Sequence, residues 1–331
     1  MSKRTPNEHV LVLPVHHQLE GIDSVEVVDT HTHVHSTFQA YKEKYPERTH
    51  ATIRDYVQAT LRPQSAQQVA AVVDVYCEGS DMAHFPDTVA ALSDLDGLSY
   101  HFVAGAHPHE AKNYTDELER QFLDAHRHPR CVGWGEIGLD YHYDNSPRDI
   151  QQEVLRRQLR TAIKSDPRKA ITIHTREADD DILRILTEEL PREQRLHIHC
   201  FTDSPSLAAS LLSHFPHLYI GITGVITYSS NLNTAQVVRD LGAACSPSSP
   251  AGLRILLESD APYMPPGNMQ AKQLGMTSKQ RFPFAHSGVL PWTAEFVAGV
   301  LNEGKGEGDE RWTTADVLRQ ARENARACYG V

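Results

Sequence analysis

Short apolar runs rich in Val and Ile recur along the chain, and longer amphipathic segments separate most of them. Runs that are apolar throughout are typical of parallel strands buried on both faces, and the amphipathic segments predict helices that cover those strands. Strands are predicted at residues 25–30, 69–76, 100–106, 131–137, 170–174, 196–199, 218–222 and 254–258. Helices are predicted at residues 115–127, 147–165, 178–189, 206–215, 234–241, 293–301 and 313–328.

This alternation predicts an α/β fold, a (β/α)8 TIM barrel. Eight strand–helix alternations with no linker in the middle of the chain favour a closed barrel over a doubly wound open sheet. The length of 331 residues falls in the range in which one barrel forms one domain. We therefore predict a single barrel domain over residues 25–331, preceded by an N-terminal arm over residues 1–24.

Two further segments depart from the repeating pattern. Residues 34–68 form a long first crossover, in which we expect two short helices interrupted at Pro46 and Pro63. Residues 261–291 leave the last strand at the C-terminal face, where barrel enzymes carry their active sites. This loop contains several Met and Phe residues, and two interpretations stay open: a surface cover packed by its own side chains, or a wall that contacts substrate.

The composition, 40% apolar and 23% charged, is that of an ordinary globular protein. No apolar run approaches the roughly 20 residues of a membrane-spanning helix, and we predict neither a signal peptide nor an anchor. The five cysteines are scattered and odd in number, which indicates neither a disulfide framework nor a thiolate metal site. We therefore expect a reducing compartment, the cytoplasm or the nucleus.

A formal net charge of −11 argues against a protein that coats nucleic acid through a broad basic surface. A small polyanionic contact stays compatible with this charge, provided that bound metal and a few local cations offset the repulsion.

Ionisable residues cluster at the ends of the predicted strands. His31 and His33 lie in the string DTHTH, where alternation along a strand puts them on the same side as Asp29. Glu136 stands among glycines at the end of an apolar strand, and burying this carboxylate without a partner would cost several kcal/mol. Three more apolar runs end in, or are followed by, residues of this kind: His174, His199 and Asp260.

Any one of these six residues could be a hydrogen-bonded core histidine or an acid paired with arginine. A barrel, however, gathers the C-terminal ends of its strands around one mouth, so six such residues can converge there. Four imidazoles and two carboxylates suit two divalent ions, and zinc, magnesium and manganese are all chemically admissible.

A series of motifs adds to this pattern. The strings are DTHTH, GAHPHEA, GEIGLDY, HTREA, HCFTDS, GITG and LESDAPYMPP, and they run in this order from residue 29 to about residue 266. In content and order the series resembles that of the TatD-type deoxyribonucleases, a family of the amidohydrolase superfamily. The resemblance implies a metal-dependent hydrolase, a nuclease that cleaves phosphodiester bonds.

Residue by residue, the resemblance implies a set of metal ligands: His31, His33, Glu136, His174, His199 and Asp260. It further implies that Glu136 bridges two ions, and that Asp260 orients a metal-bridged water and accepts its proton as the general base. The implied reaction is 3′–5′ exonuclease-like hydrolysis of DNA, with single-stranded ends as the substrate.

Three residues in or beside these motifs are candidate substrate contacts: His107, Arg176 and Tyr141. Two of them have alternative, purely structural roles: His107 could cap the turn before Pro108, and Arg176 could pair with a carboxylate such as Glu258.

Several neighbouring residues are expected to support the site without binding metal. Glu258 and Asp29 are interpreted as acids behind the ligands, and His197 as a hydrogen-bonded core histidine. Cys200 should point away from His199 by strand alternation. The chain also departs from the family pattern, since Asp203 replaces the usual glycine after HCF.

Other functions remain open at this stage. The same ligands would serve a metal-dependent esterase or deacylase, for example one acting on D-aminoacyl-tRNA. A non-catalytic barrel that binds a partner through its arm is a third hypothesis, which the intact ligand set disfavours. Phosphotriesterase-like barrels usually carry a carboxylated lysine on the fourth strand, where this chain has Glu136. The sequence leaves the oligomeric state open, a monomer included.

Overall fold

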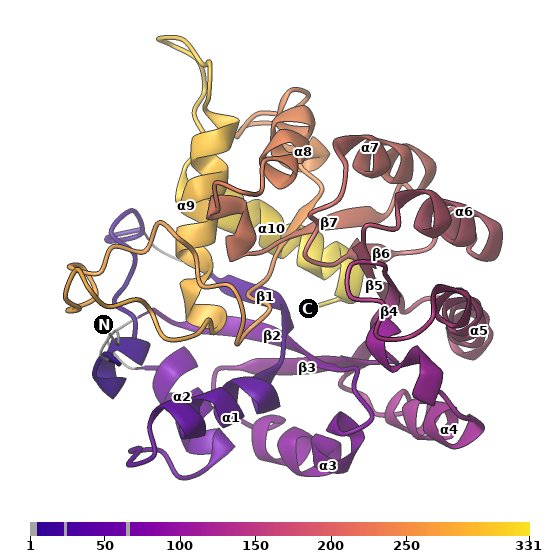
Figure 1. The fold of residues 1–331 in the computed structure, drawn as a ribbon. Coiled ribbons are helices and arrows are strands. Elements are labelled where there is room, and N and C mark those ends of the chain that lie inside the picture. Colours follow the sequence, from indigo (N-terminus) through magenta and orange to yellow (C-terminus); the bar gives the residue numbers. More distant parts are fainter. Residues whose placement is uncertain (1–4, 23–24, 64–66) are drawn as a thin grey trace.

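The computed structural model describes residues 5–22, 25–63 and 67–331, and Figure 1 shows its eight strands surrounded by helices. All eight strands are parallel and form one sheet in the order β1 to β8. Their bounds are β1 Val27–Thr32, β2 Val69–Tyr76, β3 Ser99–Ala104, β4 Cys131–Asp140, β5 Ala170–Arg176, β6 Leu196–Ile198, β7 Leu218–Ile222 and β8 Ile255–Leu257. The predicted TIM barrel is thereby confirmed.

Hydrogen bonds between β1 and the end of β8 bring the two edges of the sheet together. The Thr30 hydroxyl donates to the carbonyl of Leu257 at 3.0 Å, and the Asp260 amide donates to the carbonyl of His31 at 2.9 Å. The barrel is nearly closed, so the C-terminal ends of all its strands face one rim.

Helices alternate with the strands around the outside of the barrel (Figure 1). They are α1 Val34–Lys44, α2 Ile53–Leu61, α3 Asp81–Leu92, α4 Asp116–Ala125, α5 Arg148–Ser165, α6 Asp179–Glu189, α7 Pro205–His214, α8 Asn233–Gly242, α9 Leu290–Leu301 and α10 Thr314–Tyr329. The two helices expected in the first crossover are α1 and α2; residues 64–66 of that crossover lie outside the described residues. Helix α3 was not predicted; it contains Pro86, a residue that is disfavoured inside helices.

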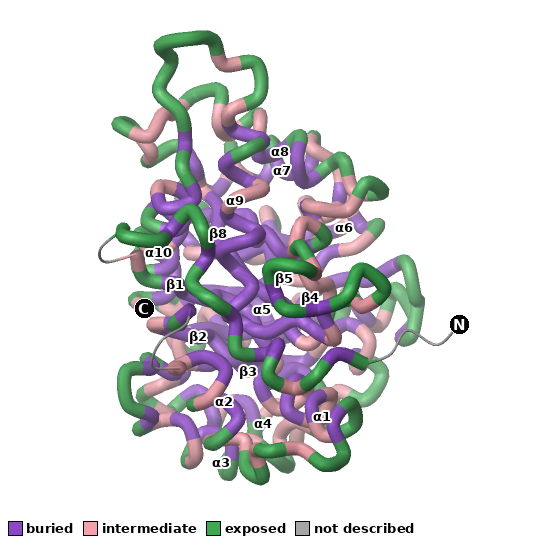
Figure 2. Tube along the Cα trace, turned by 90° about the vertical axis from the view of Figure 1, so that its left-hand side faces the viewer, coloured by how far each residue is buried: buried purple, intermediate pink, exposed green. Residues whose placement is uncertain are grey.

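The core fills the barrel and the layer between strands and helices, as the buried inner trace in Figure 2 shows. Helix α10 closes the N-terminal end of β8, where the Asn324 amide donates to the carbonyls of Leu253 and Ile255. A capping box between Thr313 and Asp316 starts this helix.

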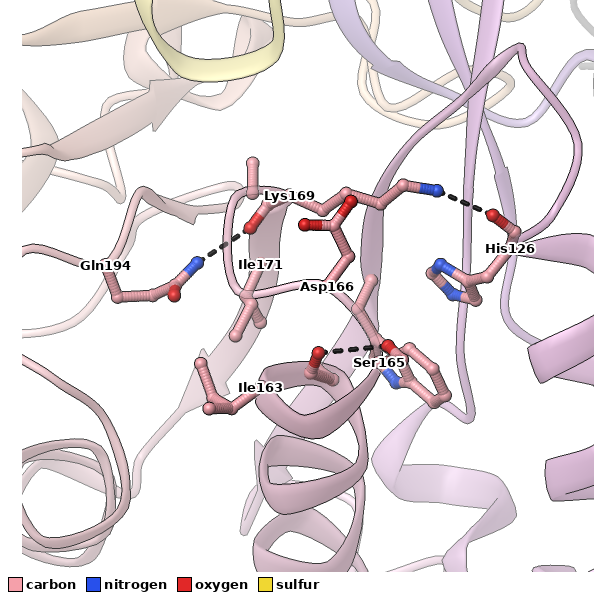
Figure 3. A pocket seen from close by; sticks show the side chains of 10 residues that line it. His126, Ile163, Ser165, Asp166, Lys169, Ile171 and Gln194 are labelled. Atoms are coloured by element: carbon pink, nitrogen blue, oxygen red, sulfur yellow. Dashed lines mark hydrogen bonds between the residues drawn. The ribbon is translucent and has the colours of Figure 1, made fainter.

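The N-terminal rim between β4 and β5 is filled by side chains (Figure 3). Lys169 donates to the carbonyl of His126 at 2.7 Å, and Gln194 donates to the carbonyl of Lys169 at the same distance. His126 also stacks on Trp134, with 4.2 Å between ring centroids. The remaining cavity of about 10 Å³ has room for one water at most.

The arm and the long loop after β8 lie against each other beside the barrel (Figure 1). Val10, Leu11 and Leu13 of the arm are buried; residues 1–4 and 23–24 of the predicted arm lie outside the described residues. The division into arm and barrel domain stays a prediction. None of the helices in the described part of the chain is both long and apolar enough to cross a membrane.

Large apolar side chains of the long loop are buried, among them Leu274, Met276, Phe282 and Phe284. Tyr263 is 56% exposed and faces the barrel mouth. The buried part of the loop is a cover packed by its own side chains, and a substrate-contacting role for the part around Tyr263 stays a prediction.

Candidate metal centre

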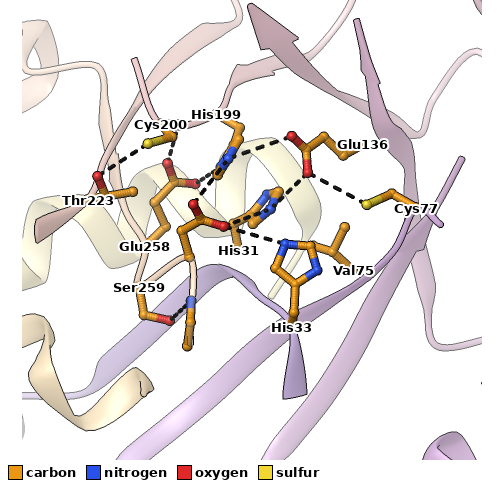
Figure 4. Close-up of polar contacts among 12 residues, drawn as sticks. His31, His33, Val75, Cys77, Glu136, His199, Cys200, Thr223, Glu258 and Ser259 are labelled. Carbon is orange, nitrogen blue, oxygen red and sulfur yellow. Dashed lines mark hydrogen bonds and ion pairs between the residues drawn. The ribbon is translucent and has the colours of Figure 1, made fainter. Parts of the chain in front are cut away.

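The structure brings together the six side chains that the sequence singled out as metal ligands. His31 lies in β1 and His33 directly follows it. Glu136 lies in β4 and His174 in β5, while His199 directly follows β6. Asp260 is the last member and lies three residues beyond β8. Figure 4 shows four of these side chains at the C-terminal rim, turned toward one another.

Glu136 occupies the middle of the group, and its two oxygens face different imidazoles. Oε2 lies 3.3 Å from His31 Nε2. Oε1 lies 2.8 Å from His174 Nδ1 and 3.7 Å from His199 Nε2. His107 Nε2 is a further neighbour of Oε1, at 3.5 Å. One carboxylate is thus positioned to serve two neighbouring groups of nitrogen ligands.

Asp260 lies on the opposite side of the group. Its Oδ1 is 3.4 Å from His33 Nε2 and 3.8 Å from His31 Nε2, and its Oδ2 is 3.8 Å from His199 Nε2. Most of these separations exceed the 2.7–3.2 Å of a good N–H···O hydrogen bond. They match the roughly 3.3 Å between ligand atoms that share an ion at about 2.0–2.1 Å.

His31 supplies a second sign that the pocket fits metal. Its ring is fully buried, and neither ring nitrogen has a hydrogen-bond partner among the described residues. Burial lowers the pKa of His31 to about 4, so its ring is neutral near pH 7 and has a lone pair for coordination. The donor atoms present therefore fit divalent ions on chemical grounds.

Carboxylates that face two of the other imidazoles raise the pKa values of these rings. Burial alone would lower the pKa of His33, yet its contact with Asp260 raises it to about 9. For His174, contacts with Asp140 and Glu136 overcome burial and raise the pKa to about 10. Burial raises the pKa of Glu136, but the surrounding imidazoles outweigh it and hold the pKa well below the usual value. Protonated imidazoles thus balance the charge of the carboxylates, and bound metal ions would balance the same charge.

Glu258 supports this group from below, as predicted. It is fully buried, lies 2.9 Å from His197 Nε2 and accepts from the Cys200 amide at 2.5 Å. It also lies 3.2 Å from His199 Nδ1, which leaves His199 Nε2 facing Glu136 and Asp260. His197 in turn bonds to the Tyr329 hydroxyl and is the expected core histidine.

Asp29 acts on the backbone rather than on an imidazole. Its carboxylate accepts from the Ser259 amide at 3.0 Å and from the Ser259 hydroxyl at 2.6 Å. Burial raises the pKa of Asp29 to about 7. Asp29 therefore fixes the segment that carries Asp260.

The prediction for Cys200 is wrong. Its sulfur was expected to point away from His199, yet it lies within 4.8 Å of ligand atoms of His199 and Asp260. Strand alternation fails here because β6 ends at Ile198 and Cys200 has a left-handed backbone, with φ of 43°.

A cavity of about 430 Å³ opens above the six side chains and is lined by His107 and Arg176. His107 caps the turn, since its Nδ1 accepts from the His109 amide, and its Nε2 faces Glu136; its contact with substrate stays a prediction. Arg176 stacks over Tyr143 at 5.0 Å. No carboxylate within the described ranges lies within 4.0 Å of its guanidinium, and Glu258, its expected partner, is used by histidines.

The structure does not bring Tyr141 into this cavity. Its hydroxyl bonds to Asp181 at 2.8 Å, and Arg148 packs over its ring at 4.4 Å. Strand β4 runs to Asp140, so the chain turns later than predicted and Tyr143 lines the cavity instead.

Asp140, which sequence reasoning missed, also lines this cavity. Asp140 lies 3.2 Å from His174 Nε2 and 3.0 Å from His109 Nε2. Burial raises its pKa, but hydrogen bonds from both histidines outweigh burial and hold the pKa far below the usual value. A signal was available, since Asp140 shares strand parity with Glu136.

Asp203, the departure from the family pattern, lines an adjoining cavity of about 690 Å³. Its carboxylate accepts from the Thr175 hydroxyl and the Glu177 amide, each at 2.9 Å. It thereby fixes the end of β5 next to Arg176.

The chain is similar to several known proteins. The human 3′-5′ RNA nuclease TATDN2 is 36% identical over 200 residues, which are 60% of this chain and 24% of the human protein. The chain thus matches about a quarter of that relative. The 3′-5′ ssDNA/RNA exonuclease TatD of Erwinia amylovora is 30% identical over 228 residues, 69% of this chain and 77% of that protein.

A solved hydrolase of the TatD family from Entamoeba histolytica has the same fold, with a TM-score of 0.70 at 14% identity over 92% of this chain and 98% of that one. A family model described as TatD related DNase matches residues 28–330. The chain therefore belongs to the TatD-related DNase family, as its motifs predict.

Proposed function

We propose that the chain is a divalent-metal-dependent phosphodiesterase that removes nucleotides from the 3′ end of single-stranded DNA. The observation that carries this proposal is the central position of Glu136, whose two oxygens face separate groups of imidazoles. Relatives named as 3′-5′ nucleases of RNA or of single-stranded DNA and RNA support the reaction and its polarity. RNA has the same phosphodiester linkage and is the second substrate to test.

We assign one ion to His31, His33, Asp260 and Glu136, and a second ion to Glu136, His174 and His199. Imidazoles suit Zn²⁺, and the carboxylates also admit Mn²⁺ or Mg²⁺. When bound, such an ion pair neutralises charge on the phosphoryl group and lowers the pKa of water toward about 7.

The chain's own residues then supply orientation and proton transfer. The Asp260 carboxylate points into the cavity and accepts the proton of the attacking water. Arg176 binds a non-bridging phosphate oxygen, because its guanidinium is aimed into the cavity by Tyr143 and has no carboxylate partner among the described residues. This local cation is needed in a chain with a net charge of −11.

The assay uses metal-free protein reloaded with Zn²⁺, Mn²⁺ or Mg²⁺ separately. Each form is given single-stranded and duplex DNA labelled at the 3′ or the 5′ end, and single-stranded RNA. We expect loss of 3′ nucleotides from single strands. Asp260→Asn should lower kcat by about 10²–10⁴-fold, the usual contribution of a general base. Asp240→Asn, on the exposed surface of α8, is the matched control and should keep wild-type turnover.

Aminoacyl-tRNA, incubated with the same metal-loaded protein, tests the alternative substrate. Release of the amino acid without cleavage of any nucleic acid would replace the nuclease assignment with a deacylase. Undiminished turnover by Asp260→Asn would refute the role of Asp260.

A further inference from the structure

A second group of metal-ligating side chains lies outside the barrel mouth, where the N-terminal arm meets α9. His16 and His17 come from the arm, and Glu295 comes from α9. His16 Nε2 lies 3.6 Å from Glu295 Oε2, and His17 Nε2 lies 3.4 Å from Glu295 Oε1. The three donor atoms all lie within 4.8 Å of one another.

These separations fit a shared ion better than direct hydrogen bonds. Two ligand atoms that bind one tetrahedral ion at about 2.0–2.1 Å are roughly 3.3 Å apart. An N–H···O hydrogen bond would bring the same atoms to about 2.7–3.2 Å. The spacing also resembles that at the barrel mouth, where His33 Nε2 and Asp260 Oδ1 are 3.4 Å apart.

His16 provides an independent indication. Its side chain is fully buried, and its Nε2 faces Glu295 without a hydrogen-bond partner in the described ranges. Its ring is held edge-on to Trp292 at 4.9 Å and against His17 at 4.4 Å. A buried nitrogen without a partner is costly, and a bound ion would remove that cost.

The other ring nitrogen of His16 permits coordination. The Gln18 backbone amide donates to Nδ1 at a long 3.4 Å, and this weak contact is given up when the ring proton moves to Nδ1 and frees Nε2 for an ion. Glu295 is held in place by the side-chain amides of Gln18 and Asn268. They donate to Oε1 at 3.2 Å and to Oε2 at 3.1 Å, respectively. The carboxylate is therefore oriented in advance.

We propose that His16, His17 and Glu295 bind one divalent transition-metal ion, best fitted by Zn²⁺. Two imidazoles and one carboxylate are a common zinc ligand set, and the half-exposed His17 leaves the fourth position open to water. The ion fastens the arm to α9, nearly 280 residues away along the chain and beside the long loop (Figure 1). The site is separate from the proposed ion sites of the barrel mouth, so its test does not depend on the proposed nuclease activity.

The test counts ions bound by the full chain. Wild type and His17→Ala are stripped of metal, dialysed against micromolar free Zn²⁺, and analysed for zinc per chain. His17 is half exposed, so its truncation should leave the fold intact, and circular dichroism checks this. The control is His217→Ala, which removes an exposed histidine beside a single carboxylate, Glu193 at 3.3 Å.

We expect His17→Ala to bind one zinc fewer than wild type, and His217→Ala to bind the same number. Hydrogen exchange gives a second readout, since Zn²⁺ should slow exchange in residues 9–20 of wild type and of His217→Ala but not of His17→Ala. Equal zinc content in wild type and His17→Ala would overturn the proposal. Filling of the site at millimolar zinc only would also overturn it, as adventitious binding.

Discussion

Replacing Glu258 by Gln tests how the ligands are held, because this residue touches histidines and lies behind the cavity. Glu258 is fully buried, accepts from the Cys200 amide, and faces His197 Nε2 and His199 Nδ1 at 2.9 and 3.2 Å. Gln keeps the shape and one acceptor oxygen but removes the charge. Its amide group must then face at least one of these donors with a donor of its own.

The expected cost is a 10–100-fold loss of metal affinity, the usual effect of removing the carboxylate behind a ligating histidine. This loss corresponds to about 1.4–2.8 kcal/mol. His199 is the ligand affected, because contact with Glu258 keeps its Nδ1 side occupied and Nε2 turned toward Glu136.

Stability without metal gives a signed pH dependence. Burial opposes charge on His199, but Glu258 and its neighbours outweigh burial and raise the pKa to about 9. A raised histidine pKa stabilises the fold fully below its unfolded value of about 6.5, and the contribution is lost as pH rises through about 9. The difference in unfolding free energy between wild type and Glu258→Gln should therefore shrink over that window.

Calorimetric titration with Zn²⁺ and denaturant unfolding at several pH values measure both quantities. Glu193→Gln, an exposed carboxylate beside His217, is the matched control and should change neither. Wild-type metal affinity in Glu258→Gln would refute the positioning role.

Two further predictions concern charge at the mouth. Zn²⁺ binding to metal-free protein at pH 7 should release protons, because His33, His174 and His199 have pKa values of about 9–10 and must lose a proton to coordinate. Titrations in buffers of different ionisation enthalpy count the released protons, and no release would contradict these pKa values. Arg176→Ala should raise KM for single-stranded DNA by about 10-fold or more, because it removes a charge-assisted phosphate contact. Arg192→Ala, outside the mouth, is the control and should leave KM unchanged. Steady-state kinetics at fixed salt measure both, and an unchanged KM in Arg176→Ala would exclude the contact.

Patterning predicted the barrel and most of its helices because parallel strands buried on both faces have an unmistakable apolar composition. It missed α3, which contains Pro86. It also placed the end of β4 too early, at residue 137. The strand continues to the polar residue Asp140, which the apolar pattern does not include.

The convergence of the six expected ligands followed from fold geometry, which delivers strand ends to one rim. Alternation predicted the side correctly within strands, as for His31 and Glu136, but failed for Cys200, which lies beyond one. The surroundings of Arg176 could not be deduced from the sequence. They depend on Glu258 facing histidines and on Tyr143 lying under the guanidinium, and both contacts appear only in the structure. Substrate identity, oligomeric state and cellular compartment stay predictions.

The central claim is that Glu136 is shared by two ions held by residues from distant strands. Anomalous diffraction from crystals loaded with Mn²⁺ tests it most directly. We predict two peaks, one on each side of the Glu136 carboxylate: the first beside His31, His33 and Asp260, the second beside His174 and His199. Density at the mouth that leaves Glu136 uncoordinated, or no peak there at all, would contradict the account.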